Sequence, residues 1–116
     1  MVKGDIRSFH PPRGPWTFVV HAGAPSDPKK LKGDPQEVMD VIAAGTRRLL
    51  DFASEKDTEA FLFLSSGAVY GPQPPELDSL PETYQGGPDI RNGRSGYGEA
   101  KRYAEVLCQA YLESKG

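Results

Sequence analysis

Two short, uninterrupted runs of apolar residues predict two buried β-strands. One lies within residues 17–24, TFVVHAGA, and the other within residues 60–64, AFLFL. A strand with one face in water alternates apolar and polar residues, whereas a continuous apolar run is typical of a strand covered on both faces, as in a parallel sheet. Small or hydroxyl residues follow each run, and they indicate where the strand ends.

Two longer segments show the spacing of amphipathic helices. The first extends from Pro35 to about Lys56, and Asp34 with Glu37 three residues later has the pattern of a capped helix start. Its apolar positions are Val38, Val41, Ile42, Gly45, Leu49 and Phe52. Because a glycine inside a helix costs about 1 kcal/mol relative to alanine, we expect a close packing contact at Gly45.

The second predicted helix spans Gly96–Ser114, with Ser95 as its cap. Its apolar positions are Tyr97, Ala100, Ala104, Leu107 and Tyr111. The order strand, helix, strand, loop, helix predicts an α/β fold, a βαβα unit with parallel strands and a right-handed crossover. We expect one domain comprising residues 1–116.

The carboxyl ends of the two strands are the expected ligand edge, because ligands bind beyond the carboxyl ends of strands in open parallel sheets. Residues 21–24, HAGA, and residues 65–71, SSGAVYG, fall there. A proline-rich connection of residues 71–94 follows, and connections of this length are usually functional or disordered. Ser65 and Ser66 are therefore predicted to lie at the ligand edge of the sheet.

Composition narrows the classes of function. The chain has 116 residues, with 14 Lys and Arg against 16 Asp and Glu, so it carries no basic excess typical of nucleic-acid binding. No apolar run is long enough for a membrane span, and the N-terminus lacks a signal-peptide core. A single cysteine, Cys108, fits a reducing, cytoplasmic compartment. Together with only two histidines, it does not form a metal-ligand pattern.

Tyr97 and Lys101 are candidates for acid/base chemistry, because residues four apart share one face of a helix. An ammonium near a phenol lowers a pKa that is normally near 10, which suits a general acid/base. Ser66 could then hold a substrate oxygen in line with Tyr97. Each feature also has a structural interpretation: such a Tyr–Lys pair is common on helix surfaces, the serines could simply end a strand, and His21 could be a hydrogen-bonded core histidine.

Five segments, in order, resemble the extended short-chain dehydrogenase/reductase family, the NAD(P)-dependent sugar-nucleotide epimerases and dehydratases. They are GDIR (Gly4–Arg7), FVVHAGA (Phe18–Ala24), AAGTRRLLDFA (Ala43–Ala53), FLFLSSGAVYG (Phe61–Gly71) and SGYGEAKRYAE (Ser95–Glu105). Together they cover nearly the whole chain. The combination is far more specific than any one of its parts.

The resemblance implies a catalytic set of three residues. Ser66, four residues before Tyr70, matches the catalytic Ser/Thr of the family. Tyr97 matches the general acid/base. Lys101 matches its partner, which also holds the nicotinamide ribose.

The resemblance also implies contacts with NAD or NADP. Asp5 and Ile6 match the residues that meet the adenine. The turn where the backbone passes the cofactor is matched by Ala22, Gly23 and Ala24, and Ser65 is placed beside the cofactor.

The chain also departs from the family pattern. The family begins with a Gly-x-x-Gly-x-x-Gly turn that holds the cofactor pyrophosphate, and this sequence contains no such motif. We therefore expect a partial Rossmann-like sheet that lacks the glycine-rich N-terminal βαβ half and the C-terminal substrate domain. Ile42 stands where many members carry asparagine. Gly67 and Ala68 stand where the 4,6-dehydratases carry an acidic pair, which favours an epimerase or a ketoreductase.

Two functional interpretations stay open at this point. The first is a fragment of an NAD(P)-dependent sugar-nucleotide epimerase or related oxidoreductase, whose substrate is a nucleotide sugar. The second is a non-catalytic relic or an interaction module. For the isolated chain we expect weak or no cofactor binding and no turnover. We also expect self-association, as a homodimer through the two long helices or at an open hydrophobic edge of the sheet.

Overall fold

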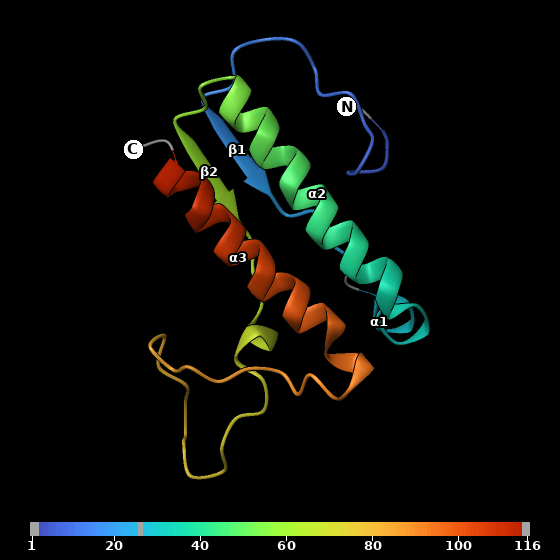
Figure 1. Ribbon diagram of the computed structural model, residues 1–116, viewed down its shortest axis with the longest axis vertical. Helices are drawn as coiled ribbons and strands as arrows, with labels where there is room; N and C mark the ends of the chain where they lie inside the picture. Colours follow the sequence, from blue (N-terminus) through green and yellow to red (C-terminus); the bar gives the residue numbers. More distant parts are fainter. Residues whose placement is uncertain (1–2, 26, 115–116) are drawn as a thin grey trace.

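The computed structural model describes residues 3–25 and 27–114, which form two layers (Figure 1). The strands are β1 (Phe18–His21) and β2 (Ala60–Phe63). The helices are α1 (Pro28–Gly33), α2 (Pro35–Glu55) and α3 (Gly96–Ser114), with two 3₁₀ turns, η1 (Gly67–Tyr70) and η2 (Gly93–Ser95). The predicted βαβα order is confirmed. Both strands are shorter than predicted, and α1 and η1 were not predicted.

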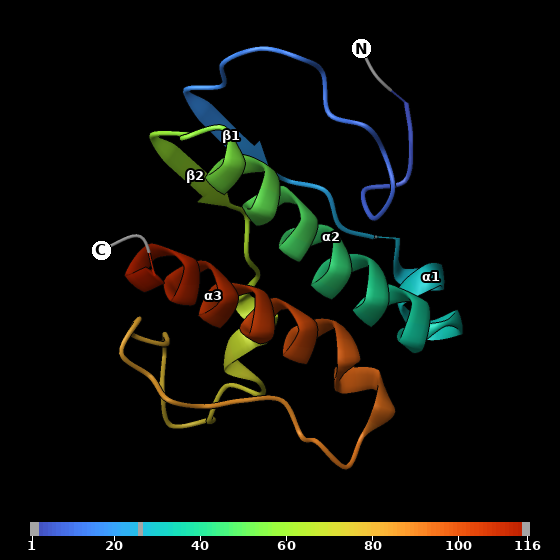
Figure 2. The same cartoon turned by 45° about the horizontal axis from the view of Figure 1, so that its top comes forward.

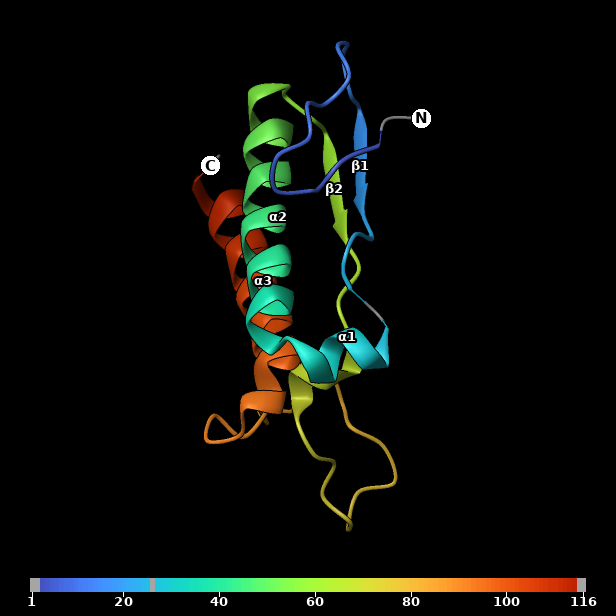
Figure 3. The same ribbon diagram turned by 90° about the vertical axis from the view of Figure 1, so that its right-hand side faces the viewer.

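The sheet consists of β1 and β2, which pair in parallel with Val19 opposite Phe61. Helices α2 and α3 both lie on one face of this sheet (Figure 3). The opposite face is open among the described residues, where Phe18, Val20 and Leu62 are 66%, 63% and 59% exposed. The continuous apolar runs correctly predicted parallel pairing, but only one sheet face is covered.

The core lies where α2 crosses α3. Its buried members are Val38 and Ile42 from α2 and Ala100 and Ala104 from α3. The two alanines allow the helix backbones to approach closely. Ile42 is 1% exposed and belongs to the buried core.

The predicted start of α2 is confirmed, because the Asp34 carboxylate accepts the Glu37 amide at 3.0 Å and Pro35 occupies the first helical position. Helix α3 begins at Gly96 as predicted. The turn that leads into it is capped by Asn92, whose side chain accepts the Arg94 amide, and not by the predicted Ser95.

Gly45 makes the predicted close contact, and its partner is the N-terminal segment. A Cβ atom at Gly45 would lie 2.5 Å from Cγ2 of Ile6, and one at Gly23 would lie 2.8 Å from Cδ1 of Ile6. The Ile6 side chain thus occupies a notch that only glycines leave open. This notch fixes the N-terminal segment against α2.

The long connection before α3 is folded back beside that helix (Figure 2). The Arg102 guanidinium donates to the carbonyl oxygens of Val69 at 3.1 Å and Gly86 at 2.6 Å. Gly71 has a φ of 71° and lies against the Gly87 carbonyl, a conformation and an approach that favour glycine. Among the described residues, no helix combines the length and the apolar character needed to cross a bilayer.

Candidate active site

Lys101 lies buried at the carboxyl end of β2. Its side chain is 3% exposed, and Nζ donates to the carbonyl oxygen of Leu64 at 2.7 Å. The same nitrogen lies 4.6 Å from the centre of the Phe63 ring. Burial lowers the pKa of Lys101, and the nearby Glu105 carboxylate opposes this shift. A charge held in such a dry site acts more strongly on neighbouring groups than it would in water.

Tyr97 lies one helical turn before Lys101. Its ring packs against the α2–α3 core and its centre lies 5.9 Å from Lys101 Nζ. The spacing in the sequence therefore brings both side chains to the same face of α3. The ammonium lies near the ring of Tyr97, while its observed hydrogen bond goes to Leu64.

Ser66 follows two residues after Leu64, so it lies at the same strand end. Its hydroxyl accepts the Ala68 amide at 3.2 Å and caps η1. Turn η1 packs against α3, where a Cβ at Gly98 would lie 2.7 Å from the Ala68 carbonyl oxygen. The fold thus holds the turn that begins at Ser66 against the first turns of α3, which carry Tyr97 and Lys101.

Ser65 lines a cavity of about 500 Å³ between α2, β2 and α3, together with Phe61, Phe63 and Cys108. Ser66 is not among the residues that line it. Cys108 is half-buried, and burial raises the pKa of its thiol. The structure therefore separates the surroundings of the two adjacent serines.

His21 is a hydrogen-bonded core histidine, as one interpretation of the sequence expected. It is 2% exposed, Nδ1 accepts the Gly23 amide, and Nε2 lies 2.9 Å from Thr46 Oγ1. With Nδ1 as acceptor, the neutral ring donates its Nε2 proton to Thr46. Burial and the Lys101 charge lower the pKa of His21 to about 4. The ring orders the turn in which Ala22 and Gly23 are exposed and Ala24 packs against the core.

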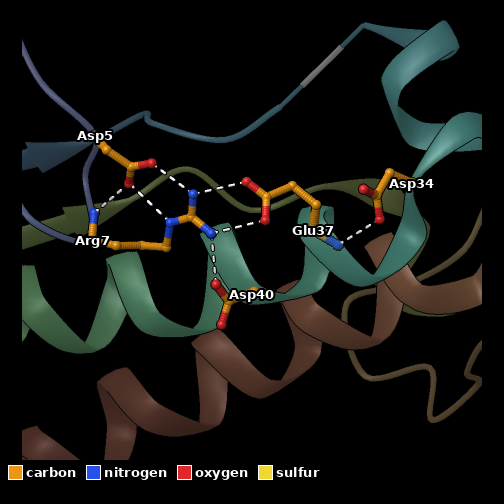
Figure 4. Close-up of polar contacts among 5 residues, drawn as sticks. All are labelled: Asp5, Arg7, Asp34, Glu37 and Asp40. Atoms are coloured by element: carbon orange, nitrogen blue, oxygen red, sulfur yellow. Dashed lines mark hydrogen bonds and ion pairs between the residues drawn. The ribbon is translucent and has the colours of Figure 1, made fainter.

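Asp5 and Ile6 lie on the N-terminal segment, where Ile6 packs beside Gly45 of α2. The Asp5 carboxylate is bound by Arg7, which also binds Glu37 and Asp40 of α2 (Figure 4). The hydrogen bonds from Arg7 lower the pKa of Asp5 to about 2. Asp5 is therefore an exposed, permanently ionised acceptor at neutral pH.

The sequence analysis did not predict the structural roles of Arg7 and Arg102. For Arg7 a local signal existed, since an Asp and an Arg two residues apart readily form a ring of hydrogen bonds between their side chains. Glu37 and Asp40, three residues apart, also fall on one face of the helix. No local signal could show that Arg7 reaches them, because they are 30 and 33 residues away along the chain.

Residues 6–116 match the model of the NAD dependent epimerase/dehydratase family, and the chain therefore belongs to this family. The partial Rossmann-like unit and the order of the motifs agree with this membership.

Among curated proteins, the chain is similar to UDP-glucuronic acid decarboxylases. It is 30% identical to UDP-glucuronic acid decarboxylase 1 of Xenopus tropicalis over 98 residues, which is 84% of this chain and 23% of that protein. It is 32% identical to UDP-glucuronic acid decarboxylase 1 of Arabidopsis thaliana over 98 residues, 84% of this chain and 22% of the relative. The chain thus spans less than a quarter of the length of these relatives.

Proposed function

We propose that this chain carries the catalytic segment of an NAD(P)-dependent sugar-nucleotide enzyme, in which Ser66, Tyr97 and Lys101 act on a substrate hydroxyl. The observation that carries the proposal is the buried Lys101 ammonium at the carboxyl end of β2, one helical turn after Tyr97. A buried lysine that served packing alone would be costly, because desolvation disfavours its charged form.

The residues present fit the nicotinamide end of such a cofactor. Lys101 uses one of its three N–H groups on Leu64, which leaves two to donate to ribose hydroxyls. At the opposite end, the Asp5 carboxylate offers an acceptor to the adenine. The glycine-rich pyrophosphate turn has no counterpart in the sequence, so the chain would hold the two ends of the cofactor better than its middle.

The three side chains divide the chemistry between them. When bound, NAD(P) supplies the hydride acceptor for oxidation of the hydroxyl to a ketone. Tyr97 acts as the general base that takes the hydroxyl proton, and Lys101 Nζ lies 5.9 Å from the centre of its ring. The Ser66 hydroxyl accepts the Ala68 amide through a lone pair, so its own proton remains available to the substrate oxygen.

The substrate class that we propose is a UDP-linked sugar, because the similar proteins are named for UDP-glucuronic acid. Oxidation of a hydroxyl two carbons from a carboxylate creates a ketone that accepts the electron pair released with carbon dioxide. The same oxidation also begins an epimerisation. Gly67 and Ala68 supply no carboxylate beside Ser66, which supports these reactions over water elimination.

The cofactor part of this proposal is tested by titrating the whole 116-residue chain with NAD while its amide signals are recorded by NMR. We expect a dissociation constant no tighter than roughly millimolar, about −4 kcal/mol, with shifts around Lys101 and residues 22–24. Lys101→Ala should remove the shifts at the nicotinamide end, whereas Lys56→Ala, at the exposed end of α2, should leave them unchanged. Saturating NAD with no shift at this edge would contradict the proposal.

The alternative, an interaction module, is favoured by one observation, the open apolar sheet face formed by Phe18, Val20 and Leu62. A face of this kind promotes association. We expect the chain to self-associate, which sedimentation velocity at high micromolar concentration would detect. A monodisperse, folded monomer there would count against this interpretation and leave the catalytic proposal standing.

A further inference from the structure

Arg7 joins the N-terminal segment to α2, and every donor of its guanidinium is hydrogen-bonded (Figure 4). Nε and Nη2 donate to the two oxygens of Asp5 at 3.0 and 2.6 Å. Nη1 and Nη2 donate to the two oxygens of Glu37 at 2.9 and 2.8 Å, and Nη1 also donates to Asp40 at 2.6 Å. Because a guanidinium has five N–H groups, Arg7 has none left for a ligand.

The bonds from Arg7 are distributed unequally over the Asp5 carboxylate. Oδ1 accepts both the Arg7 amide at 2.8 Å and Nε at 3.0 Å, which uses its two lone pairs. Among the described residues, Oδ2 accepts only Nη2. One acceptor position therefore remains on Oδ2, and the Asp5 side chain is 42% exposed. A ligand that meets this carboxylate must present a donor there.

We propose that Arg7 is a positioning residue for base recognition, which fixes Asp5 so that Oδ2 accepts the exocyclic amino group of adenine and disfavours a 6-oxo purine. This inference rests on the proposed function, in which Asp5 meets the cofactor's adenine. A 6-oxo purine would place its own carbonyl oxygen against the carboxylate, and two acceptors repel each other.

The surroundings of the segment explain why an arginine is required for this role. Glu37 and Asp40 lie on the first two turns of a long helix, and the forked guanidinium matches their carboxylates in a fixed geometry. Ile6 is held in the notch between Gly23 and Gly45. The acceptor is thus aimed before any ligand arrives, which reduces the ordering cost of binding. A lysine would keep the charge and lose the fork.

The chain contains a matched control for this argument. Asp89-Ile90-Arg91 repeats the tripeptide Asp5-Ile6-Arg7, and Arg91 binds Asp89 with the same three donors. The Arg91 side chain is 86% exposed, whereas that of Arg7 is 25% exposed. Changing Arg91 therefore removes an identical local ring from a site with no proposed role in binding.

The test compares NAD with its hypoxanthine analogue, in which a carbonyl oxygen replaces the adenine amino group. Both are titrated by NMR into the 116-residue chain and into its Arg7→Gln, Arg7→Lys and Arg91→Gln variants. We expect wild type and Arg91→Gln to bind NAD about fivefold more tightly than the analogue, as for one net hydrogen bond. Arg7→Gln should reduce this preference below about twofold, and Arg7→Lys should restore it only in part.

A full preference in Arg7→Gln would overturn the inference. Equal affinities of wild type for the two dinucleotides would also overturn it. If the NMR signals around Lys101 still shifted on binding, the proposed function would stand. If neither dinucleotide shifts any signal, both fail together. Circular dichroism checks that Arg7→Gln is folded. If it is not, Asp40→Ala, which removes one acceptor of Arg7 at an exposed position, must lower the preference or the inference is wrong.

Discussion

Asp5-Ile6-Arg7 and Asp89-Ile90-Arg91 are one tripeptide in two settings. In both, the arginine amide and Nε donate to the same aspartate oxygen, at 2.8 and 3.0 Å in the first and 3.0 and 3.0 Å in the second. In both, Nη2 binds the other oxygen. Hydrogen bonds from the arginine lower the pKa of each aspartate. The local ring is therefore a property of the tripeptide alone.

The two settings differ in everything beyond that ring. Ile90 is 86% exposed, whereas Ile6 fills the notch beside Gly23 and Gly45. Arg91 is bound to Asp89, whereas Arg7 reaches two further carboxylates on α2. The tripeptide sequence alone is enough to form the Asp–Arg hydrogen bonds. Only the contacts with a second element, helix α2, hold Asp5 in a fixed position.

The largest expected effect comes from His21, whose turn forms one wall of the Ile6 notch. Its pKa is lowered to about 4 in the folded chain, against about 6.5 when unfolded. Between these values the unfolded chain binds more protons, so the free energy of unfolding falls as the pH falls. We expect a loss of about 2 to 3 kcal/mol from pH 7 to pH 4, with allowance for solvent screening.

Urea unfolding at pH 7, 5.5 and 4 measures this loss, and hydrogen exchange follows the amides of both tripeptides. His21→Gln should flatten the pH dependence, while His10→Ala should not. The Arg7 amide, which donates to Asp5 Oδ1, should lose protection as the pH falls, while the matching Arg91 amide should be unaffected. An equal pH dependence in His21→Gln and wild type would exclude His21 as the titrating group.

The two isoleucines give the next largest contrast. Ile6→Ala should lower the free energy of unfolding by about 2 kcal/mol, since it empties a packed notch. Ile90→Ala should change it by less than about 0.5 kcal/mol, because the side chain is in water. Denaturant titration of both variants measures the difference. Similar losses in the two would mean that the notch does not stabilise the segment.

The smallest effect is expected for the glycine that forms the notch. Gly45→Ala places a Cβ 2.5 Å from Ile6 Cγ2, an overpacking that costs about 1 to 3 kcal/mol, while alanine in a helix recovers about 1 kcal/mol. We expect a net loss of about 1 kcal/mol by thermal or urea unfolding. Gly33→Ala, with no atom within 4 Å of the added carbon, is the control. A Gly45→Ala variant more stable than wild type would show that Ile6 moves aside freely.

The elements that the sequence predicted well are those with strong periodicity or cap signals. Asp34 and Pro35 predict where helix α2 begins, and the helical spacing of apolar residues predicts the extent of α3. The segment Pro28–Gly33 was missed because its PKKLKG sequence has no apolar period. Turn η1 was missed because GAVY reads equally as the end of a strand. Short elements such as these depend on their neighbours for stability.

The candidate site was predictable where its residues are neighbours on one element. Tyr97 and Lys101 are separated by one helical turn, so their shared face follows from the sequence alone. The bond from Lys101 to Leu64 joins residues 37 apart, and those from Arg102 span 33 and 16 residues. Such contacts follow from the packing of α3 on the strand end, which no local pattern encodes.

The two hydrogen bonds of Arg102 affect how the chain between Val69 and Gly86 tolerates changes in length. By binding Val69 and Gly86, Arg102 closes the chain between them into a loop whose two ends are fixed. The closure entropy of a loop grows only with the logarithm of its length, so doubling it costs about 0.6 kcal/mol. Insertions between Gly71 and Gly86 should therefore be accepted readily, so that this loop could vary in reach while the strand end and α3 stay in place.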